Sequence, residues 1–478
     1  MRRDKLLLAG QWMDGDAGTL AVPSPFDGRP VARVARAGAA QLRGAADAAA
    51  AAVPEMAALT PERRAHILES SGEWLRAHRD SAARALVAQA GKPLALARAE
   101  VDRAGDTFRA AAHVARHPET AARDLGGFAS GAGRLALIRR VPAGPVLAVT
   151  PFNFPLNLVA HKLAPAVAAG CPVVLKPASQ TPTPALLVGE ALLAAGLPPA
   201  GLSVLPAAAA DMDPLVEDPR FALLTFTGSA AVGWALKHRA AARRVALELG
   251  GNAAAVVEPD AGDLAAVAAR LASGAFAYAG QSCISVQRIF VQARIYPQFK
   301  RLLVEATRAV PAGNPADAAT VCGPMIDAAN ADRIMAWIAS ARAAGARLLC
   351  GGTRQGAVIA PALLENVPPA EPLAADEVFG PVAALWPYDD FEEALAGVND
   401  SRYGLQAGIF TRDLAKIRRA WDVLDVGAVI QGDMPTWRSD PMPYGGVKDS
   451  GLGREGPAWA YLEMTEERML VLRDEGRG

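Results

Sequence analysis

The sequence predicts an α/β protein built around a mostly parallel sheet. Three short apolar runs, residues 146–150, 172–176 and 223–226, are each followed by a turn and a helical stretch. Short buried strands that alternate with helices indicate parallel pairing with right-handed crossovers. In such sheets ligands bind beyond the carboxyl ends of the strands, so we expect a binding site where these three runs end.

Helices precede this alternating region, because the pattern is helical from about residue 39 to 117. Thr60 and Pro61 form a start signal, with threonine as the N-cap and proline at the first helical position. A strong helix-forming stretch over residues 80–90 stops at a Gly-Lys-Pro sequence, and a further helix is predicted over residues 100–113.

A second alternating region begins at Asn252 and contains the glycine-bearing segments 280–288 and 377–381. The last segment, from about Tyr461, alternates as a terminal strand would. Residues 119–137 are rich in glycine and lack sustained periodicity, so they are predicted to leave the main body of the protein.

Composition excludes several classes of partner. The 478 residues include 49 Lys and Arg and 49 Asp and Glu, so no broad basic field is available to hold nucleic acid or an anionic membrane. The four cysteines form no CxxC pair, which argues against a zinc site or a disulfide framework and predicts no metal.

The N-terminal apolar run at residues 6–9 is too short for the core of a signal peptide. No stretch of about 18 apolar residues indicates a membrane span. We therefore predict a cytoplasmic protein in a reducing compartment.

Cys283 and Glu248 are the candidate reactive pair. They lie in the sequences GQSCISVQR and ELGGN, which both contain glycine and are predicted to form loops. A thiolate is a strong nucleophile, and an acyl group on sulfur needs an activated water to leave, which a carboxylate can provide. The alternative is that Cys283 is an inert core residue, the commoner fate of a free cysteine.

Three residues at predicted strand ends could complete a site. Asn153 could donate its amide to an oxyanion, or could satisfy its own backbone in a turn. Lys176 could bind ribose hydroxyls or remain a solvated lysine. The turn at Gly228 could bring a phosphate to a helix N-terminus, although it lacks the GxGxxG spacing and could be a plain strand-to-helix turn.

Two further features are ambiguous. Glu377, before an aromatic residue and Gly-Pro, could accept hydrogen bonds from a ribose or could be a surface acid. Phe154, Asn157 and His161 have i, i+3, i+7 spacing and are predicted to share one helix face. A histidine on such a face is usually packed against a partner.

Seven segments, in this order, resemble the aldehyde dehydrogenase superfamily over almost the whole chain. They are residues 150–155 (TPFNFP), 175–178 (LKPA), 226–229 (FTGS), 247–252 (LELGGN), 280–283 (GQSC), 377–381 (EVFGP) and 443–451 (PYGGVKDSG). Within the superfamily the sequence is most similar to lactaldehyde, non-phosphorylating glyceraldehyde-3-phosphate and phosphonoacetaldehyde dehydrogenases.

The resemblance implies a Rossmann-like cofactor domain, an α/β catalytic domain and a small β arm for oligomerisation. It assigns residues 1–118 and 138–250 to NAD(P) binding and residues 251–450 to catalysis. Residues 119–137 and 461–478 would form the arm of a homodimer or homotetramer.

The same resemblance implies roles for individual residues. Cys283 would be the nucleophile, Glu248 the general base, and Asn153 would form an oxyanion hole with the backbone N–H of Cys283. Lys176 would hold the adenosine ribose, Ser229 the pyrophosphate, and Glu377 with Phe379 the nicotinamide ribose and ring. The implied cofactor-binding positions are Thr150, Phe152, Lys176, Ser179, Gly228, Ser229, Gly233, Leu249, Gly250, Glu377 and Phe379.

The cofactor is predicted to be NAD or NADP. Many NAD-preferring relatives carry a glutamate three residues after the ribose lysine, and this sequence has Ser179 there. A serine leaves room and no repulsion for a 2′-phosphate, so NADP should be tolerated and a preference for NADP stays open.

The predicted substrate is a small aldehyde with a polar or anionic group. Asn157 and His161 would give the aldehyde tunnel a polar wall, and Arg103 and Arg438 could pair with an anionic tail. Ser282 replaces one possible anion-binding arginine beside the nucleophile. The candidate substrate contacts are Arg103, Phe154, Asn157, His161, Ser282, Ile284 and Arg438.

Two other functions stay open at this point. A coenzyme-A-acylating or semialdehyde-specific dehydrogenase is the first, although acylating relatives look different at the ELGG position and its retention here favours hydrolysis. A binding or structural protein that reuses the scaffold without turnover is the second, and the retained Asn153, Glu248 and Cys283 argue against it.

Overall fold

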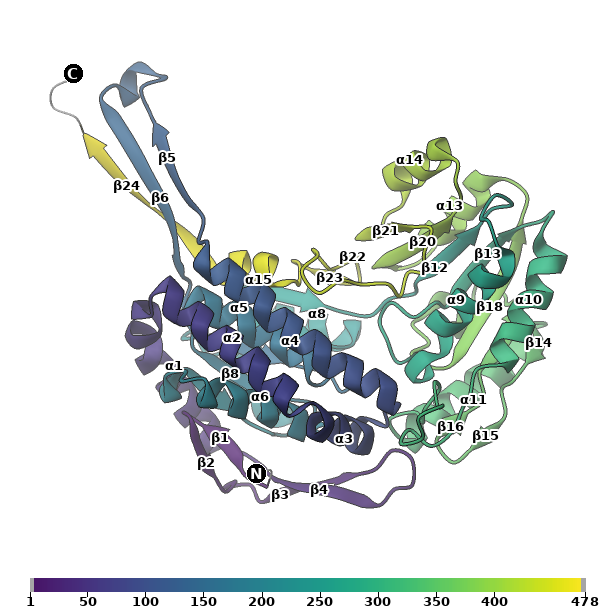
Figure 1. The fold of residues 1–478 in the computed structure, drawn as a ribbon, viewed down its shortest axis with the longest axis horizontal. Coiled ribbons are helices and arrows are strands. Elements are labelled where there is room, and N and C mark those ends of the chain that lie inside the picture. Colours follow the sequence, from purple (N-terminus) through teal and green to yellow (C-terminus); the bar gives the residue numbers. More distant parts are fainter. Residues whose placement is uncertain (1–3, 474–478) are drawn as a thin grey trace.

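Two large sheets and an extended arm organise the chain (Figure 1). The structure is a computed structural model, and it describes residues 4–473. Helices flank both large sheets, which confirms the predicted α/β class. None of the helices in the described range is both long and apolar enough to cross a bilayer.

The first sheet has eight strands, and five consecutive neighbours in it run parallel. In sheet order the strands are β2 (Gln11–Met13), β1 (Leu6–Leu8), β9 (Leu202–Val204), β8 (Val173–Lys176), β7 (Val146–Val149), β10 (Leu223–Thr227), β11 (Arg244–Glu248) and β23 (Gly451–Leu452). Because β8, β7 and β10 are parallel neighbours, their carboxyl ends meet at one edge, as the sequence predicted.

Helices cover both faces of this sheet. They are α1 (Ala39–Ala58), α2 (Pro61–Ala77), α3 (Arg79–Ala90), α4 (Leu94–Arg116), α5 (Asn157–Ala169), α6 (Pro182–Ala194), α7 (Asp213–Val216) and α8 (Ala230–Arg239). The helices α2 to α6 pack on the face that presents Val146 and Ala148, and α1 and α7 pack on the face that presents Leu147. The alternation of burial along β7 produces these two separate cores.

Two helix boundaries test the predictions. The hydroxyl of Thr60 accepts a hydrogen bond from the N–H of Arg63, so the predicted N-cap is confirmed. The helix predicted over residues 100–113 is longer, because α4 begins directly after Pro93 and no proline or glycine interrupts residues 94–99.

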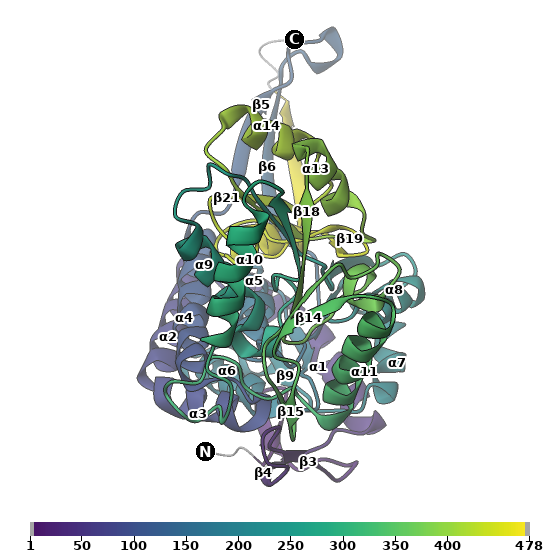
Figure 2. The same cartoon turned by 90° about the vertical axis from the view of Figure 1, so that its right-hand side faces the viewer.

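The second sheet has seven strands between two layers of helices. Its strands are β14 (Arg347–Cys350), β17 (Ala362–Glu365), β18 (Val382–Tyr388), β13 (Arg288–Gln292), β12 (Ala254–Val257), β20 (Gln406–Phe410) and β21 (Ala428–Gln431). Its helices are α9 (Leu264–Phe276), α10 (Tyr296–Arg308), α11 (Ala328–Ala343), α12 (Pro372–Ala375), α13 (Phe391–Asn399) and α14 (Leu414–Val423). Figure 2 shows α9 and α10 on one side of β18 and α11 on the other.

The predicted domain limits can be compared with these sheets. The first sheet takes its strands from residues 6–248 and 451–452, and the second takes all of its strands from residues 254–431. The division into a cofactor domain and a catalytic domain at these limits stays our prediction.

A three-stranded sheet projects from the body as an arm (Figure 1). It consists of β5 (Thr120–Asp124), β6 (Arg134–Pro142) and β24 (Thr465–Arg473), with β6 in the middle. The glycine-rich excursion predicted at residues 119–137 therefore contains strands, and the arm continues to Pro142. Sequence periodicity did not indicate β5 because its residues are exposed on both faces.

Smaller elements complete the chain. They are the hairpin β3 (Thr19–Pro23) and β4 (Pro30–Ala35), the pairs β15 (Arg354–Gln355) with β16 (Val358–Ile359) and β19 (Tyr403–Gly404) with β22 (Val447–Lys448), and the helix α15 (Pro457–Glu463).

Candidate active site

A cavity of 1320 Å³ is lined by residues from both halves of the chain. Its walls include the segments that follow β7, β8, β10 and β11, together with loop residues from the second half. Cys283, Glu248 and Asn153 all line it. The position of the cavity beyond the carboxyl ends of parallel strands agrees with the site that the strand pattern predicted.

Two glycines let the loops around this cavity touch. A Cβ atom on Gly251, in the loop after β11, would lie 2.2 Å from the carbonyl oxygen of Cys283. A Cβ atom on Gly280, which has a φ of 65°, would lie 2.2 Å from the carbonyl oxygen of Gly380. Because no side chain fits at either glycine, the three loops pack backbone against backbone.

The segment that leads to Cys283 is conformationally strained. Tyr278 and Ala279 have φ values of 53° and 54°, in the left-handed region that side chains other than glycine avoid. The hydroxyl of Tyr278 donates to the carbonyl oxygen of Ala90 at 3.0 Å. The backbone N–H of Tyr278 donates to the carbonyl oxygen of Val321 at 2.9 Å. These contacts hold a strained turn directly before the cysteine, as is common at functional sites.

The sulfur of Cys283 lies 2.7 Å from the hydroxyl oxygen of Tyr444. Burial raises the pKa of the Cys283 thiol to about 12. The Tyr444 hydrogen bond and the charge of Arg438 oppose this rise, whereas the carboxylates of Glu377 and Glu248 add to it.

The amide of Asn153 is tied to the cysteine loop. Its Nδ2 donates to the carbonyl oxygen of Gln281 at 3.1 Å, and its Oδ1 accepts the backbone N–H of Phe154 at 3.1 Å. The side chain is buried and lines the cavity. One N–H of the Asn153 amide is used by Gln281, which leaves the second for a ligand oxygen.

Glu248 is the last residue of β11 and is buried. Burial raises the pKa of Glu248 well above its usual value, and the charge of Glu455 raises it further. Its Oε2 has no hydrogen-bond partner within the described chain. A carboxyl group with a raised pKa is a stronger base when it is ionised.

We call one wall the strand-end side, and it consists of Thr150, Lys176, Ser179, Thr227 and Ser229. The hydroxyl oxygens of Thr150 and Thr227 are buried without a hydrogen-bond partner among residues 4–473. Lys176 is also buried, and burial alone lowers its pKa, with no opposing carboxylate. Ser229 is the N-cap of α8, and its side chain makes no capping hydrogen bond.

Glu377 and Phe379 also line the cavity. One carboxylate oxygen of Glu377 accepts the backbone N–H of Gly251 at 3.0 Å. Burial raises the pKa of Glu377 to about 7, and that hydrogen bond acts in the opposite direction. Phe379 has a φ of 45°, and its ring meets the edge of Phe152 with centroids 5.8 Å apart.

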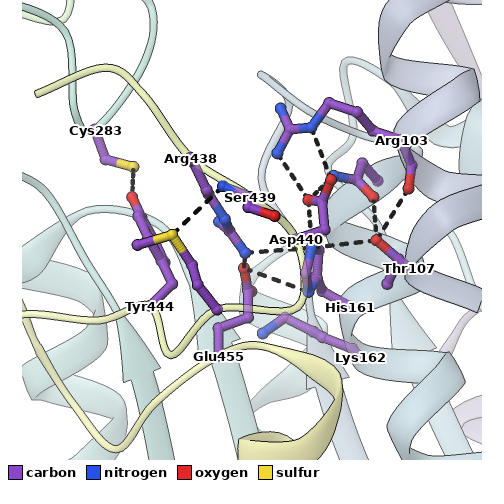
Figure 3. Close-up of polar contacts among 12 residues, drawn as sticks. Arg103, Thr107, His161, Lys162, Cys283, Arg438, Ser439, Asp440, Tyr444 and Glu455 are labelled. Carbon is purple, nitrogen blue, oxygen red and sulfur yellow. Dashed lines mark hydrogen bonds and ion pairs between the residues drawn. The ribbon is translucent and has the colours of Figure 1, made fainter. Parts of the chain in front are cut away.

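The opposite wall is backed by a group of charges that we call the ion-pair cluster: Arg103, His161, Arg438, Asp440 and Glu455 (Figure 3). Arg103 donates to both oxygens of Asp440, at 2.9 and 2.8 Å. Arg438 donates to Glu455 at 2.6 Å, and both are buried. Arg103, Arg438 and Glu455 line the cavity.

His161 does not line the cavity, contrary to the predicted tunnel wall. Its Nε2 lies 2.9 Å from Asp440, and burial lowers the pKa of the His161 ring despite the neighbouring carboxylates. The helix α5 begins at Asn157, so Phe154 precedes it and the three residues do not share one helix face. Phe154 and Asn157 do line the cavity.

Gly233 also lies outside the cavity wall. A Cβ atom there would be 2.3 Å from Cδ2 of Leu249, so this glycine lets α8 pack against the loop after β11. The remaining predicted contacts line the cavity: Phe152, Gly228, Leu249, Gly250, Ser282 and Ile284.

Sequence reasoning missed several residues of the site. Tyr444 lies in the segment 443–451 that was noted for its resemblance, but no role was predicted for it. Lys92 and Glu100 form a fully buried ion pair on the cavity wall, and the Lys92 ammonium lies 3.6 Å from the ring centroid of Phe154. The only sequence signal for Lys92 was its place at the end of α3, where a solvated lysine is the ordinary expectation.

No group of three or more His, Cys, Asp or Glu side chains in the described range is arranged to hold a metal ion.

Comparisons with known proteins all point to one family. The model of the Aldehyde dehydrogenase family matches residues 12–470. The chain is 40% identical to the 3-sulfolactaldehyde dehydrogenase of Priestia aryabhattai, over 98% of this chain and 97% of that protein.

Two solved structures are similar throughout. One is aldehyde dehydrogenase 21 from Physcomitrella patens in complex with the reaction product succinate, with a TM-score of 0.97, 43% identity and coverage of 99% of this chain and 98% of that one. The other is the NADP-dependent glyceraldehyde-3-phosphate dehydrogenase from Bacillus halodurans C-125 complexed with NADP, with a TM-score of 0.95, 34% identity and coverage of 98% and 99%.

Proposed function

The chain belongs to the aldehyde dehydrogenase family, and from this premise we propose that it oxidises a small polar or anionic aldehyde to the carboxylic acid with NAD(P)+. The main support is that Cys283, Glu248 and Asn153 line one cavity together with Arg103 and Arg438. A nucleophile, a base and an oxyanion donor are the groups that this reaction requires, and the two cations suit an anionic substrate.

The strand-end side fits a pyridine nucleotide. Its unpartnered hydroxyls of Thr150 and Thr227 and its buried Lys176 need polar partners, and a dinucleotide offers them. We propose that Lys176 binds the adenosine ribose and that Ser229, at the N-terminus of α8, binds the pyrophosphate.

The other end of the cofactor would lie near Cys283. Glu377 is the proposed acceptor for the nicotinamide ribose hydroxyls, and Phe379 the proposed contact of the ring. When bound, the oxidised nicotinamide supplies a hydride acceptor.

We propose that NADP is accepted as well as NAD. Ser179 lines the cavity three residues after Lys176, and its hydroxyl donates to the carbonyl oxygen of Ala207 at 3.4 Å. A serine at position 179 places no carboxylate there to repel a 2′-phosphate. The ratio of kcat/KM for the two cofactors measures the preference.

The first chemical step takes place on sulfur. The Cys283 thiol first gives its proton to water. The resulting thiolate attacks the aldehyde carbon, a C–S bond forms, and the π electrons of the C=O bond move to oxygen. The free N–H of the Asn153 amide and the backbone N–H of Cys283 would stabilise this oxyanion, and such donors contribute about 2.7–4 kcal/mol each. Loss of hydride from the carbon then leaves a thioester on Cys283.

Glu248 would complete the reaction by hydrolysis. It removes a proton from water, the water oxygen attacks the thioester carbon, and the sulfur leaves as thiolate with the carboxylic acid as product. The raised pKa of buried Glu248 suits this role, because a carboxylate with a higher pKa is a stronger base toward water.

The ion-pair cluster supports an anionic substrate. The Arg438 side chain is 8% exposed and lines the cavity, and its Nε–H has no acceptor within the described residues. Arg103 is a third exposed and lies on the same wall. A carboxylate or sulfonate tail would supply the missing acceptor. The relative described above is named for an aldehyde with such a tail, 3-sulfolactaldehyde.

A panel of aldehydes, read by NAD(P)H absorbance, tests this function. We expect succinate semialdehyde and 3-sulfolactaldehyde to have a higher kcat/KM than butanal, a neutral aldehyde of similar length. Faster oxidation of butanal would contradict the anionic specificity, and no NAD(P)H formation with any aldehyde would contradict the activity. Addition of coenzyme A should leave the product a free acid; a thioester product would instead indicate the acylating alternative.

We also propose a cytoplasmic homodimer or homotetramer that assembles through the arm. All four cysteines are free, which suits a reducing compartment. Met469 and Leu470 on β24 are 59% and 58% exposed, so a second copy could cover them.

A further inference from the structure

Tyr444 lies between a buried cation and the reactive sulfur. Its hydroxyl oxygen is 2.7 Å from Sγ of Cys283, and the guanidinium carbon of Arg438 is 3.8 Å from the centroid of its ring. Figure 3 shows the Cys283 sulfur at the Tyr444 hydroxyl and the Arg438 guanidinium at Glu455. None of the steps proposed above uses the Tyr444 hydroxyl.

The phenol is held rigidly in this position. The backbone N–H of Tyr444 donates to the carbonyl oxygen of Glu455 at 2.9 Å, and the return bond, from the N–H of Glu455, is 2.6 Å. The ring is buried against Ile284 and Leu405. Because backbone and ring are both fixed, the hydroxyl cannot move away from the sulfur without moving the strand-like segment that holds it.

The hydroxyl has one protein partner in the described chain, the sulfur of Cys283. A phenylalanine would fill nearly the same volume, so packing alone does not require the oxygen. A phenol can accept a hydrogen bond from a thiol, and it can donate one to a thiolate. Donation to the ionised sulfur is the stronger arrangement, because hydrogen bonds to a charged acceptor are about twice as strong as neutral ones.

We propose that Tyr444 is a catalytic residue whose hydroxyl donates a hydrogen bond to the Cys283 thiolate, and that Arg438, stacked on its ring, strengthens this donor. The inference rests on the proposed function only in taking Cys283 as the nucleophile. A cation against the ring face withdraws electron density from the phenol and is itself attracted to the ring. The hydroxyl thus stabilises the nucleophilic form of a thiol that burial disfavours.

The protonation state of the phenol agrees with this role. Burial raises the pKa of Tyr444 well above 10, and the neighbouring sulfur raises it further. The phenol therefore keeps its proton throughout the working range and remains a donor.

Alkylation of Cys283 by iodoacetamide, followed by mass spectrometry of the peptide that contains it, tests the proposal in the full-length protein without substrate or cofactor. At a fixed pH near 8, Tyr444→Phe should slow alkylation by about 3- to 10-fold. The thiolate fraction falls about tenfold for each unit of pKa, while the more basic thiolate regains part of the rate through higher nucleophilicity. Loss of the hydroxyl also opens space, so steric effects would act in the opposite direction.

Tyr296→Phe is the matched control. It removes a hydroxyl that donates to Glu365 at 2.9 Å, away from the cavity, and should leave the alkylation rate of Cys283 unchanged. An unchanged or faster rate in Tyr444→Phe, with the control at the wild-type rate, would overturn the proposal.

A second substitution covers the case in which Tyr444→Phe does not fold. Site-specific replacement of Tyr444 by 3-fluorotyrosine keeps the shape and makes the phenol a stronger donor, so alkylation should be faster than in the wild type. A wild-type or slower rate would contradict the proposal. Because alkylation needs no aldehyde, failure of the proposed function would appear in the aldehyde panel and not in this experiment.

Discussion

On the strand-end side of the cavity, buried polar groups make no ion pair within residues 4–473, whereas the charges of the ion-pair cluster are paired with opposite charges, even though Nε of Arg438 and Oε2 of Glu455 have no further hydrogen-bond partner among those residues. Lys176 and the hydroxyls of Thr150 and Thr227 belong to the first kind. Arg103 with Asp440 and Arg438 with Glu455 belong to the second. Unpaired buried groups cost free energy until a ligand satisfies them, so the strand-end side depends on its ligand for compensation.

The difference also concerns rigidity. The guanidinium groups of the ion-pair cluster are oriented before any substrate enters, because carboxylates already hold them. An aldehyde with an anionic tail would meet a preorganised site, which reduces the entropy lost on binding. The four predictions below test this comparison, beginning with the largest expected effect.

Cys283→Ala should abolish turnover while the strand-end side stays intact. We expect kcat to fall by roughly 10³-fold or more, since no other nucleophile can form the thioester. The affinity for NAD(P), measured by calorimetry, should stay at the wild-type value. Full activity in this variant would remove the covalent mechanism, and a parallel loss of cofactor affinity would mean that the two sides are not independent.

Glu248→Gln should separate the two chemical steps. We expect a burst of NAD(P)H followed by a steady-state rate about 10²–10⁴-fold below the wild type, because the thioester forms but water is not activated. In the wild type the hydrolysis rate should rise with pH as the raised pKa of Glu248 is passed, since the deprotonated form is the base. The rate of the variant should not rise in this way. An unchanged steady state would contradict the assignment of the base.

Glu455→Gln should destabilise the protein by leaving Arg438 as a buried cation without its carboxylate. Breaking one partner of a buried pair typically costs about 3–5 kcal/mol. We expect a clearly lower Tm in thermal unfolding followed by circular dichroism. A Tm equal to that of the wild type would mean that the ion-pair cluster orients its guanidinium groups but does not stabilise the folded protein.

Lys176→Met is the matched change on the strand-end side, and its expected effect is the smallest. Removal of an unpaired buried cation should leave the Tm unchanged or slightly higher. The Kd for NAD(P) should rise by about tenfold, since one charge-assisted hydrogen bond is lost. A fall in Tm comparable to that of Glu455→Gln would break the contrast between the two sides.

The sequence was a good guide to features that depend on local pattern. The strands that end near residues 149, 176 and 227 were predicted from short apolar runs, and their parallel order followed from the helices between them. The segments of Cys283 and Glu248 could be recognised because their glycines and reactive side chains are contiguous.

Features that depend on distant residues could not be predicted. His161 turns toward Asp440, almost three hundred residues away, so its helical spacing said little about the direction of its side chain. The contact between Cys283 and Tyr444 and the burial of Lys92 against Phe154 are likewise long-range. Strand β5 of the arm escaped detection because its exposed residues impose no alternating pattern, whereas β24 was predicted as a terminal strand.

The pairing of β24 with β6 has a consequence for biosynthesis. Thr465 to Arg473 pair with Pro142 to Arg134 along the full length of both strands. One edge of β6 therefore stays unpaired until residues 465–473 have been synthesised. Ribosomes add about 5–20 residues per second, and the edge therefore stays open for roughly 15–60 s during translation. A nascent or prematurely terminated chain exposes this edge to other chains, and chaperones would be needed most during that interval.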